Sequence, residues 1–397
     1  MSTPQSELDP FTRERFVAEA IEATGLDDFG EPYWQEGLDR LLDSLVETAR
    51  LNETGVMVAG GGVVTDLSNR LRIEQWRKDH PGVAEQRIVR PIVIVGQPRT
   101  GTTILHDLMA QDPANRAPLS WEIERPVPAP RTETYTSDPR IDECQAGFDL
   151  VESIIPGFTS FHELGATLAQ EDVRICTSDF RSMQYPLQFE VPAYNRWLLH
   201  EADMSSAYRW HRRFLQHLQS EHMAERWLLK SPAHLWHLPD LLAEYPDAIV
   251  VQNHRDPLKV IASISALGAS LREMTTDHFD VRTLAAQYAD DIVVGLDRAL
   301  QARHDGLFAP GQVVDVRFQD FRSDPIAAVA GIYDEIGLEL TAESERNMRT
   351  FLADHPGDPD NQLRRYSFSD TGLDEAELRE RVREYQEHFD VDSERLT

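Results

Sequence analysis

Eight consecutive residues in the first third of the chain have the spacing of a phosphate-binding loop. Four residues separate two glycines, and two threonines follow: Gly96, Gln97, Pro98, Arg99, Thr100, Gly101, Thr102 and Thr103. Glycines let backbone N–H groups approach an anion, and the start of a following helix adds partial positive charge. The segment therefore predicts a site for a ligand that carries a phosphate group.

The loop lacks the lysine that a nucleoside triphosphatase needs. A Walker A loop places Lys and then Ser or Thr after its second glycine, whereas this chain has Thr102 and Thr103 there. The missing lysine contacts the β- and γ-phosphates during triphosphate hydrolysis. Arg99 is the cation that this loop carries instead. We therefore expect a phosphate-bearing ligand other than a nucleoside triphosphate.

A second group of anion-binding residues follows much later in the chain. Arg255 precedes Asp256 and Pro257, a pair that is typical of a helix cap and a first helical residue. Ser263 then lies about two turns into the predicted helix. A guanidinium binds phosphate through two donors, and a hydroxyl can add a third. Arg255 and Ser263 are therefore predicted to bind a second phosphate.

Four short apolar runs, each followed by a helical pattern, must position these groups. The runs are residues 90–96, 227–230, 248–253 and 313–318. Alternating strands and helices predict an α/β fold, with a parallel sheet flanked by helices. Ligands of such sheets bind at the carboxyl ends of the strands. Gly96, Lys230 and Arg255 all fall at such ends, so we expect them to converge on one edge of the sheet.

These motifs resemble those of the sulfotransferases that use 3′-phosphoadenosine 5′-phosphosulfate (PAPS), and most of all the bacterial branch of that P-loop-like superfamily. The resemblance covers residues 90–390, and its most specific part is P-R-T-G-T-T at residues 98–103. It implies that the loop binds the 5′-phosphosulfate and that Arg255 and Ser263 hold the 3′-phosphate. It also implies that Lys230 lies near the transferring sulfuryl group.

The same resemblance implies the co-substrate and a third binding segment. PAPS is the expected donor, adenosine 3′,5′-bisphosphate the expected product, and no metal ion is required. A late basic segment is expected to close over the nucleotide, with Arg364, Arg365 and Tyr366 as contacts.

Sulfuryl transfer is expected to depend on charge stabilisation and on a base that deprotonates the acceptor. Arg99 and Lys230 suit the stabilising role. Glu122 follows the loop helix where relatives of the tyrosylprotein sulfotransferases carry a catalytic glutamate. His234 follows Lys230, two residues later than the Lys-x-His spacing of the small-molecule enzymes. We favour Glu122 as the base, with His234 second.

The acceptor is expected to be a small molecule, although its identity is not encoded in a motif. Aromatic residues between positions 180 and 197 favour a hydrophobic alcohol or phenol, but packing in the core explains them equally well. Glu171 and Asp172 could line the acceptor site. A homo-oligomer is compatible with the sequence.

Charge and composition narrow the class of protein. The 397 residues carry a formal charge of −29, which disfavours binding to a nucleic acid backbone. Two cysteines fit a reducing compartment. The first residues are polar and acidic, and no apolar run is long enough to span a bilayer. We therefore expect a cytoplasmic protein.

Two parts of the chain are expected. Residues 1–88 form an N-terminal helical region, which a turn at residues 60–62 (Gly-Gly-Gly) interrupts. Residues 89–397 form the PAPS-binding domain, with a helical insertion at about 138–223. Two alternatives remain open at this point: a small-molecule kinase with a P-loop, and a nucleotide-binding protein without catalytic activity.

Overall fold

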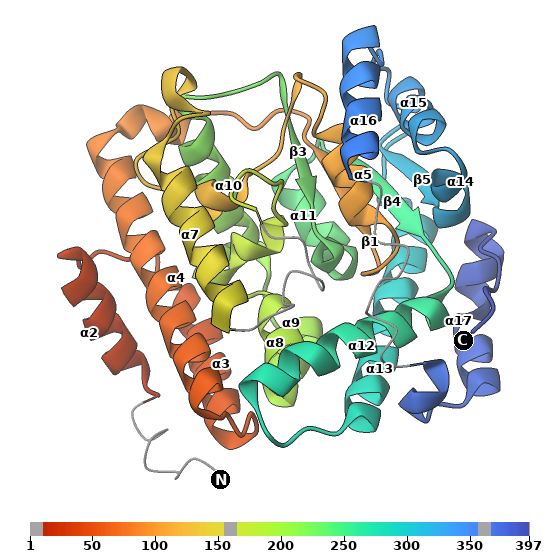
Figure 1. The fold of residues 1–397 in the computed structure, drawn as a ribbon, viewed down its shortest axis with the longest axis horizontal. Coiled ribbons are helices and arrows are strands. Elements are labelled where there is room, and N and C mark those ends of the chain that lie inside the picture. The colour runs from red at the N-terminus through yellow and green to blue at the C-terminus, as the bar shows by residue number, and fades with distance from the viewer. Residues whose placement is uncertain (1–10, 155–164, 356–366, 397) are drawn as a thin grey trace.

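The computed structural model describes residues 11–154, 165–355 and 367–396. Within these residues, five parallel strands form one sheet in the order β2-β3-β1-β4-β5 (Figure 1). The strands are β1 (Ile92–Gly96), β2 (Asn115–Arg116), β3 (Arg226–Lys230), β4 (Ile249–His254) and β5 (Val313–Arg317). The predicted parallel α/β architecture is confirmed.

The central strand β1 is buried along its whole length. Its β-branched residues pack on both faces of the sheet, which explains the unbroken apolar run in the sequence. In the ladder Ile94 is paired with Lys230, and Gly96 with Asn253. This register brings the ends of β1, β3 and β4 to the same edge of the sheet.

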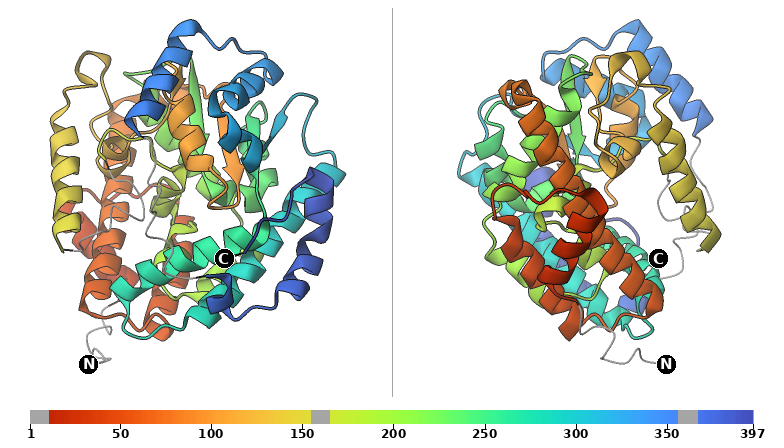
Figure 2. Two further views of the ribbon diagram at one scale, coloured as in Figure 1. Left: turned by 45° about the vertical axis from the view of Figure 1, so that its right-hand side comes forward. Right: turned by 90° about the vertical axis from the view of Figure 1, so that its left-hand side faces the viewer.

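Helices cover both faces of the sheet (Figure 2). Val93 and Val95 point into one hydrophobic cluster, and Ile92 and Ile94 point into the other. The helices of the domain are α5 (Thr102–Met109), α6 (Ser120–Glu124), α11 (Leu238–Glu244), α12 (Pro257–Thr275), α13 (Val281–His304), α14 (Phe318–Ser323), α15 (Pro325–Glu335), α16 (Ala342–Asp354) and α17 (Glu375–Phe389).

The N-terminal helices belong to the same hydrophobic cluster as one face of the sheet. They are α2 (Arg13–Thr24), α3 (Trp34–Glu47) and α4 (Glu53–Asp79). Phe16, Leu38 and Leu67 share that cluster with Val93 and Val95. The helical region before the sheet is thus packed onto it through a continuous core.

The expected turn at residues 60–62 is wrong, because these three glycines lie inside α4. Glycine lowers helix stability by about 1 kcal/mol per residue relative to alanine, and tertiary packing overrides that cost here. Asn52 caps the helix by accepting a hydrogen bond from the Gly55 amide at 2.8 Å. A Cβ on Gly55 would stand 2.1 Å from the Thr275 carbonyl oxygen, so that glycine lets α4 approach the end of α12.

The segment between β2 and β3 is largely helical. It contains α7 (Pro139–Ile154), α8 (Gln184–Gln188), α9 (Pro192–His200) and α10 (Ser205–Gln219), together with the short 3-10 helices η4 (Asp172–Arg174) and η5 (Cys176–Asp179). The aromatic residues of this segment pack in the core: Phe180, Tyr185, Phe189, Tyr194 and Trp197. Core packing therefore accounts for them.

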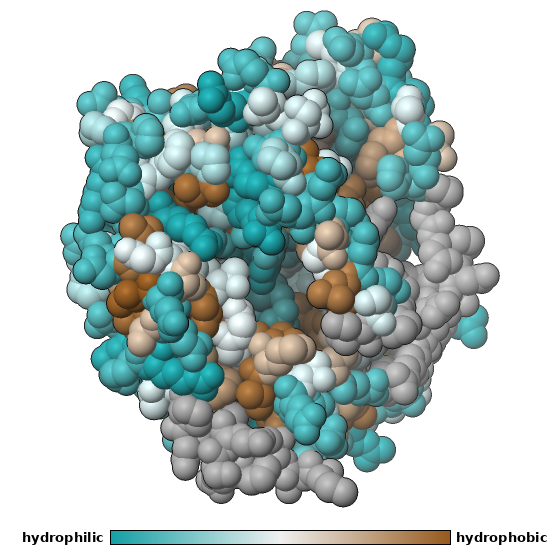
Figure 3. Space-filling model, turned by 60° about the vertical axis from the view of Figure 1, so that its left-hand side comes forward, coloured by the Kyte–Doolittle hydropathy of each residue, from teal (hydrophilic) through white to brown (hydrophobic). Residues whose placement is uncertain are grey.

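Exposed hydrophobic side chains are scattered on the side that carries α4 and α7. Met57 is 60% exposed and Leu150 is 59% exposed. Figure 3 shows hydrophobic patches on this side, beside a hollow with hydrophilic walls. No helix in the described ranges combines the length and apolarity needed to cross a bilayer.

We predict that the protein loses stability as the pH falls from 7.5 to 5. Burial lowers the pKa of His106 and His217 to about 4 and that of His237 to about 3. At these three sites the unfolded chain, in which a histidine has a pKa of about 6.5, therefore binds more protons than the folded chain in this range. Each of the three histidines should cost on the order of 2 kcal/mol of unfolding free energy at pH 5, which outweighs the opposite effect of Asp66 and Asp291, whose pKa burial raises to about 6.

Urea unfolding at the two pH values measures this loss. His106→Gln should flatten the pH dependence, whereas His200→Gln, at an exposed site, should leave it unchanged. Equal unfolding free energies of the wild type at pH 7.5 and 5 would contradict the interpretation.

Candidate active site

The loop between β1 and α5 has the backbone of an anion-binding turn. Gly96, Arg99 and Gly101 have φ angles of 144°, 68° and 86°. Arg99 is the only one of the three with a side chain, so its left-handed backbone is strained. Helix α5 begins directly after Gly101, so its first N–H groups are available to an anion.

Contacts behind the loop fix its shape. The Thr100 hydroxyl donates to the Gln97 carbonyl at 2.6 Å, and the side-chain Nδ2 of Asn253 donates to the Thr100 carbonyl at 3.3 Å. Gln97 is buried and donates to the Ile292 carbonyl on α13 at 3.1 Å. A Cβ on Gly96 would lie 2.7 Å from the Asn253 carbonyl oxygen. The loop is therefore held against the end of β4.

Arg99, Arg255 and Ser263 are joined by hydrogen bonds. Arg99 Nε donates to Ser263 Oγ at 3.1 Å, and Arg255 Nη1 donates to the Arg99 carbonyl at 2.8 Å. Burial lowers the pKa of Arg99, and the positive charge of Arg255 lowers it further. Two neighbouring guanidinium groups thus meet beside a hydroxyl, which suits the binding of a multiply charged anion.

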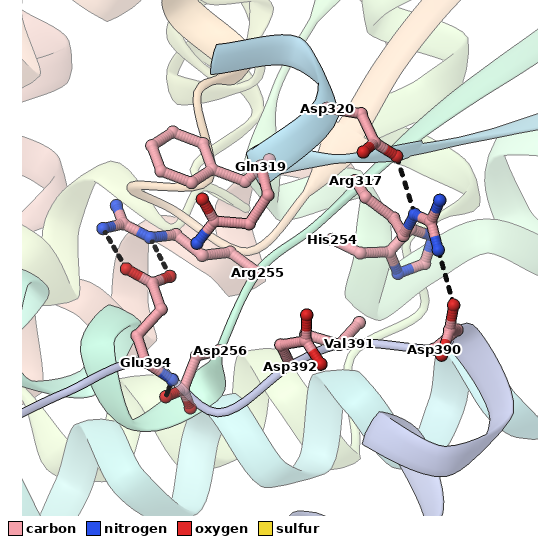
Figure 4. Close-up of a pocket in the computed structure, with 11 residues that line it drawn as sticks. His254, Arg255, Asp256, Arg317, Gln319, Asp320, Asp390, Val391, Asp392 and Glu394 are labelled. Carbon is pink, nitrogen blue, oxygen red and sulfur yellow. Dashed lines mark hydrogen bonds and ion pairs between the residues drawn. The ribbon is translucent and has the colours of Figure 1, made fainter. Parts of the chain in front are cut away.

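The outer side of Arg255 faces a cavity near the C-terminus (Figure 4). The cavity has about 560 Å³ of empty space, part of it open to solvent. Phe318 lies on its wall, with the ring centre 4.0 Å from the Arg255 guanidinium carbon. Glu394 accepts two hydrogen bonds from Arg255, at 2.8 and 3.1 Å. The cavity thus combines a guanidinium, an aromatic face and a carboxylate.

Lys230 lies at the carboxyl end of β3 and reaches the start of α5. Its Nζ donates to Thr103 Oγ1 at 3.1 Å and to Glu171 Oε1 at 2.5 Å. The Lys230 side chain is 1% exposed, whereas that of Glu171 is 25% exposed, and Thr103 is exposed. Solvent, and hence a ligand, therefore reaches Thr103 and Glu171, whereas Lys230 itself is buried next to them.

A buried hydrogen-bond network stands behind Glu171. Asp172 Oδ2 lies 3.0 Å from His234 Nε2 and 3.2 Å from His211 Nε2. The Nδ1 atoms of the two imidazoles pair with the Tyr208 and Tyr245 hydroxyls at 2.9 and 2.7 Å. Burial alone would raise the pKa of Asp172, but the two histidines lower it below its ordinary value. The network ties η4 to η6 (Pro232–His237), the segment after Lys230.

Glu122 is fully buried and has partners within its own neighbourhood. Its carboxylate accepts hydrogen bonds from Arg116 at 2.6 Å, from the Leu119 amide at 2.8 Å and from the Tyr135 hydroxyl at 3.1 Å. The Arg116 guanidinium in turn stacks on Trp227, 4.4 Å from the ring centre. These contacts cap α6 and fix β2 beside β3.

The sequence analysis predicted most of the residues that meet at this site, but not all of the contacts between them. Gly96–Thr103, Lys230, Arg255 and Ser263 come together, whereas Arg364, Arg365 and Tyr366 lie outside the described residues. Glu171 was expected only to line the acceptor site. Glu394 was missed, because an isolated glutamate near the end of a chain carries no motif.

A second, narrower cavity lies beside His234. Its walls are mostly apolar and include Met183, Leu198 and Met204, and Ser231 and His234 supply polar atoms.

In the described part of the chain, no group of three or more His, Cys, Asp and Glu side chains is arranged to hold a metal ion.

Comparisons with known proteins agree with this geometry. The family model described as sulfotransferase family matches residues 91–342. The chain is 27% identical over 297 residues to omega-hydroxy-beta-dihydromenaquinone-9 sulfotransferase Stf3 of Mycobacterium bovis, which covers 70% of this chain and 72% of the relative.

Two solved structures share the whole fold. The crystal structure of sulfotransferase STF9 from Mycobacterium avium has a TM-score of 0.87 and 30% identity, covering 97% of this chain and 98% of that one. That of sulfotransferase STF1 from Mycobacterium tuberculosis has a TM-score of 0.84 and 33% identity, covering 93% and 98%.

We predict that Asp172→Asn lowers the free energy of unfolding by about 1–3 kcal/mol, the cost of leaving a buried hydrogen-bonding group without a proper partner. The amide has only one accepting oxygen for the two imidazoles. Urea unfolding at pH 7.5 measures the loss. Tyr208→Phe removes only an outer bond of the network and should cost less. An unchanged stability of the Asp172→Asn variant would show that the network does not hold η4 in place.

Proposed function

The chain belongs to the sulfotransferase family, and from this premise we propose that it transfers the sulfuryl group of PAPS to a hydroxyl or amine of a small-molecule acceptor. The observation that carries the choice of PAPS is the convergence of three segments at one edge of the sheet. The loop with Lys230, and Arg255 with Ser263, would form two neighbouring anion-binding regions, which the contacts of Arg99 link to each other. PAPS carries an anionic group at each end of its nucleoside, which matches this division.

In the proposed complex, the loop and the start of α5 bind the 5′-phosphosulfate. Arg255 and Ser263 bind the 3′-phosphate, and Phe318 offers an aromatic face on the nucleoside side. Lys230 and Arg99 stabilise negative charge on the transferring group and on the leaving phosphate. The acceptor oxygen or nitrogen forms the new bond to sulfur, the bond from sulfur to the bridging oxygen breaks, and adenosine 3′,5′-bisphosphate leaves.

The proton of the acceptor goes to a carboxylate or imidazole at this edge, and Glu122, His234 and Glu171 are the candidates. The contacts favour Glu171, because its carboxylate touches Lys230 and is partly exposed. Glu122 and His234 are buried, and each has partners that hold it in the fold. Glu171 therefore replaces Glu122 as our preferred base.

A hydrophobic alcohol is the acceptor class that we propose. The relative Stf3 is named for an omega-hydroxy-dihydromenaquinone, which is an alcohol with a long apolar chain. Ser231 and His234, which follow Lys230 in the chain, border a narrow and mostly apolar cavity, and we propose that an apolar part of the acceptor lies against it.

Nucleotide binding tests the proposed donor. Adenosine 3′,5′-bisphosphate should bind about 10²-fold more tightly than adenosine 5′-monophosphate, because charge-assisted hydrogen bonds contribute roughly 1.5–3 kcal/mol each. Arg255→Ala should remove most of this difference while the loop still holds the 5′-phosphate. Calorimetry with and without Mg²⁺ measures both. The proposal would be overturned if the wild type bound the two nucleotides with equal affinity and Arg255→Ala changed neither affinity. Tight Mg²⁺-dependent binding of ATP would overturn it as well.

A second experiment identifies the base. Glu171→Gln should lower kcat by about 10²–10⁴-fold, the usual contribution of a general base, with adenosine 3′,5′-bisphosphate binding retained. Glu122→Gln is the matched control, because it makes the same carboxylate-to-amide change at a buried site. The rate of transfer from labelled PAPS to a hydroxylated acceptor is measured as a function of pH for the wild type and for both variants. Normal turnover by Glu171→Gln, with a loss in folded Glu122→Gln, would restore Glu122 as the base.

A further inference from the structure

The phosphate-binding side of Arg255 is engaged by a carboxylate of the protein itself. Arg255 Nε and Nη2 donate to Glu394 Oε1 and Oε2, at 2.8 and 3.1 Å (Figure 4). The two side chains are only 21% and 15% exposed. The third nitrogen, Nη1, donates to the Arg99 carbonyl at 2.8 Å. Three of the five N–H groups of this guanidinium are therefore used inside the fold, and its Nε–Nη2 edge is occupied by Glu394.

A carboxylate and a phosphate compete for the same donors. Both present two oxygens at a spacing that a guanidinium binds through a pair of parallel hydrogen bonds. Phe318 covers the guanidinium at 4.0 Å from its ring centre, which restricts the directions from which an anion can approach. Glu394 thus uses the bidentate edge on which a 3′-phosphate would depend.

The backbone around Glu394 is anchored by contacts that do not involve Arg255. The Glu394 amide donates to Asp256 Oδ2 at 2.6 Å. Asp256 also accepts two hydrogen bonds from Arg379 on α17, at 2.6 and 3.0 Å, and one from the Leu258 amide at the start of α12. The Glu394 side chain can therefore turn away while the segment that carries it stays in place.

The adjoining cavity gives that side chain room to move. Its empty space of about 560 Å³ is bounded on one side by residues 390–392 and Glu394, and on the other by Phe318 and Gln319. In Figure 4 the carboxylate of Glu394 reaches across from its segment to Arg255. A rotation of one side chain would expose the donors of Arg255 to a ligand.

We propose that Glu394 is a displaceable internal competitor for the 3′-phosphate, which limits how tightly the enzyme holds PAPS and the nucleotide product. This proposal rests on the function proposed above. When Glu394 occupies Arg255, only the fraction of molecules with the pair open binds the 3′-phosphate, so the apparent dissociation constant rises by the inverse of that fraction. A nucleotide without a 3′-phosphate leaves the pair intact and is not affected. The same competition promotes release of adenosine 3′,5′-bisphosphate after transfer.

The test compares Glu394→Gln with Asp392→Asn. Asp392 lies on the same segment and on the same cavity wall, and among the described residues no hydrogen bond or ion pair joins it to Arg255. Both substitutions remove one negative charge near the cavity, so Asp392→Asn measures the general electrostatic effect. Circular dichroism and thermal unfolding check that both variants keep the fold.

Calorimetry with adenosine 3′,5′-bisphosphate and with adenosine 5′-monophosphate gives the result. Glu394→Gln should bind the bisphosphate on the order of 10-fold more tightly, with slower dissociation in a displacement experiment, and the monophosphate within about twofold of the wild type. Asp392→Asn should change both affinities by a similar, smaller factor. No gain for the bisphosphate, or an equal gain for both nucleotides, would overturn the role of Glu394.

The two nucleotide affinities show whether a failed test contradicts the role of Glu394 alone or the proposed function as well. If the wild type prefers the bisphosphate and Glu394→Gln does not strengthen its binding, Glu394 is a structural partner of Arg255 and PAPS remains the donor. If neither the wild type nor Glu394→Gln distinguishes the two nucleotides, both proposals are wrong.

Discussion

The parallel pairing of β1 with β3 and β4 places Gly96, Lys230 and Arg255 at one edge of the sheet. These residues are far apart in the sequence. Without that register they would not lie close enough together to form a site. Both faces of β1 are buried, so a shift by one residue would exchange the side chains that enter the two hydrophobic clusters. Packing in these clusters therefore fixes the register. The same packing that stabilises the sheet therefore aligns the site.

Internal carboxylates neutralise the cations that this alignment brings together. Lys230 is paired with Glu171, and Arg255 with Glu394. A buried lysine or arginine without a partner would be costly, and the chain as a whole carries a charge of −29. A ligand with two anionic ends would exchange these internal partners for its own charges. In the complex proposed above, Glu171 would stand beside the transferring end of the donor and Glu394 beside its nucleoside end, so the two glutamates would have different roles once released.

The sequence predicted the elements whose signals are local. The strands around 92–96, 226–230 and 249–254 could be recognised because each contains a short unbroken apolar run, at residues 92–95, 227–229 and 249–251, that is buried in the sheet. The loop could be recognised because it needs glycines at fixed spacing. The continuous helix α4 could not, since the three glycines favour a turn and only tertiary packing overrides them. The Arg255–Glu394 pair joins residues 139 positions apart, and no local pattern encodes such a contact.

The N-terminal helices, to which the sequence assigned no chemistry, support the segment that carries Glu171. Asp66 on α4 accepts hydrogen bonds from Thr177 at 2.6 Å and from Tyr185 at 3.0 Å. Arg70, one turn further along, donates to the Ser178 carbonyl at 3.1 Å. Burial raises the pKa of Asp66 to about 6 despite the nearby positive charge of Arg174.

These contacts link α4 to the site through a short stretch of chain. η5 (Cys176–Asp179) follows η4 (Asp172–Arg174) directly, and Asp172 is bound in turn to His234, four residues after Lys230. The segment that carries Glu171 is thus held on one side by the hydrogen bonds of Asp66 and Arg70 on α4, and on the other by the end of β3. Two parts of the fold therefore position the Glu171 carboxylate beside Lys230: the sheet, and the helices that precede the sheet in the chain.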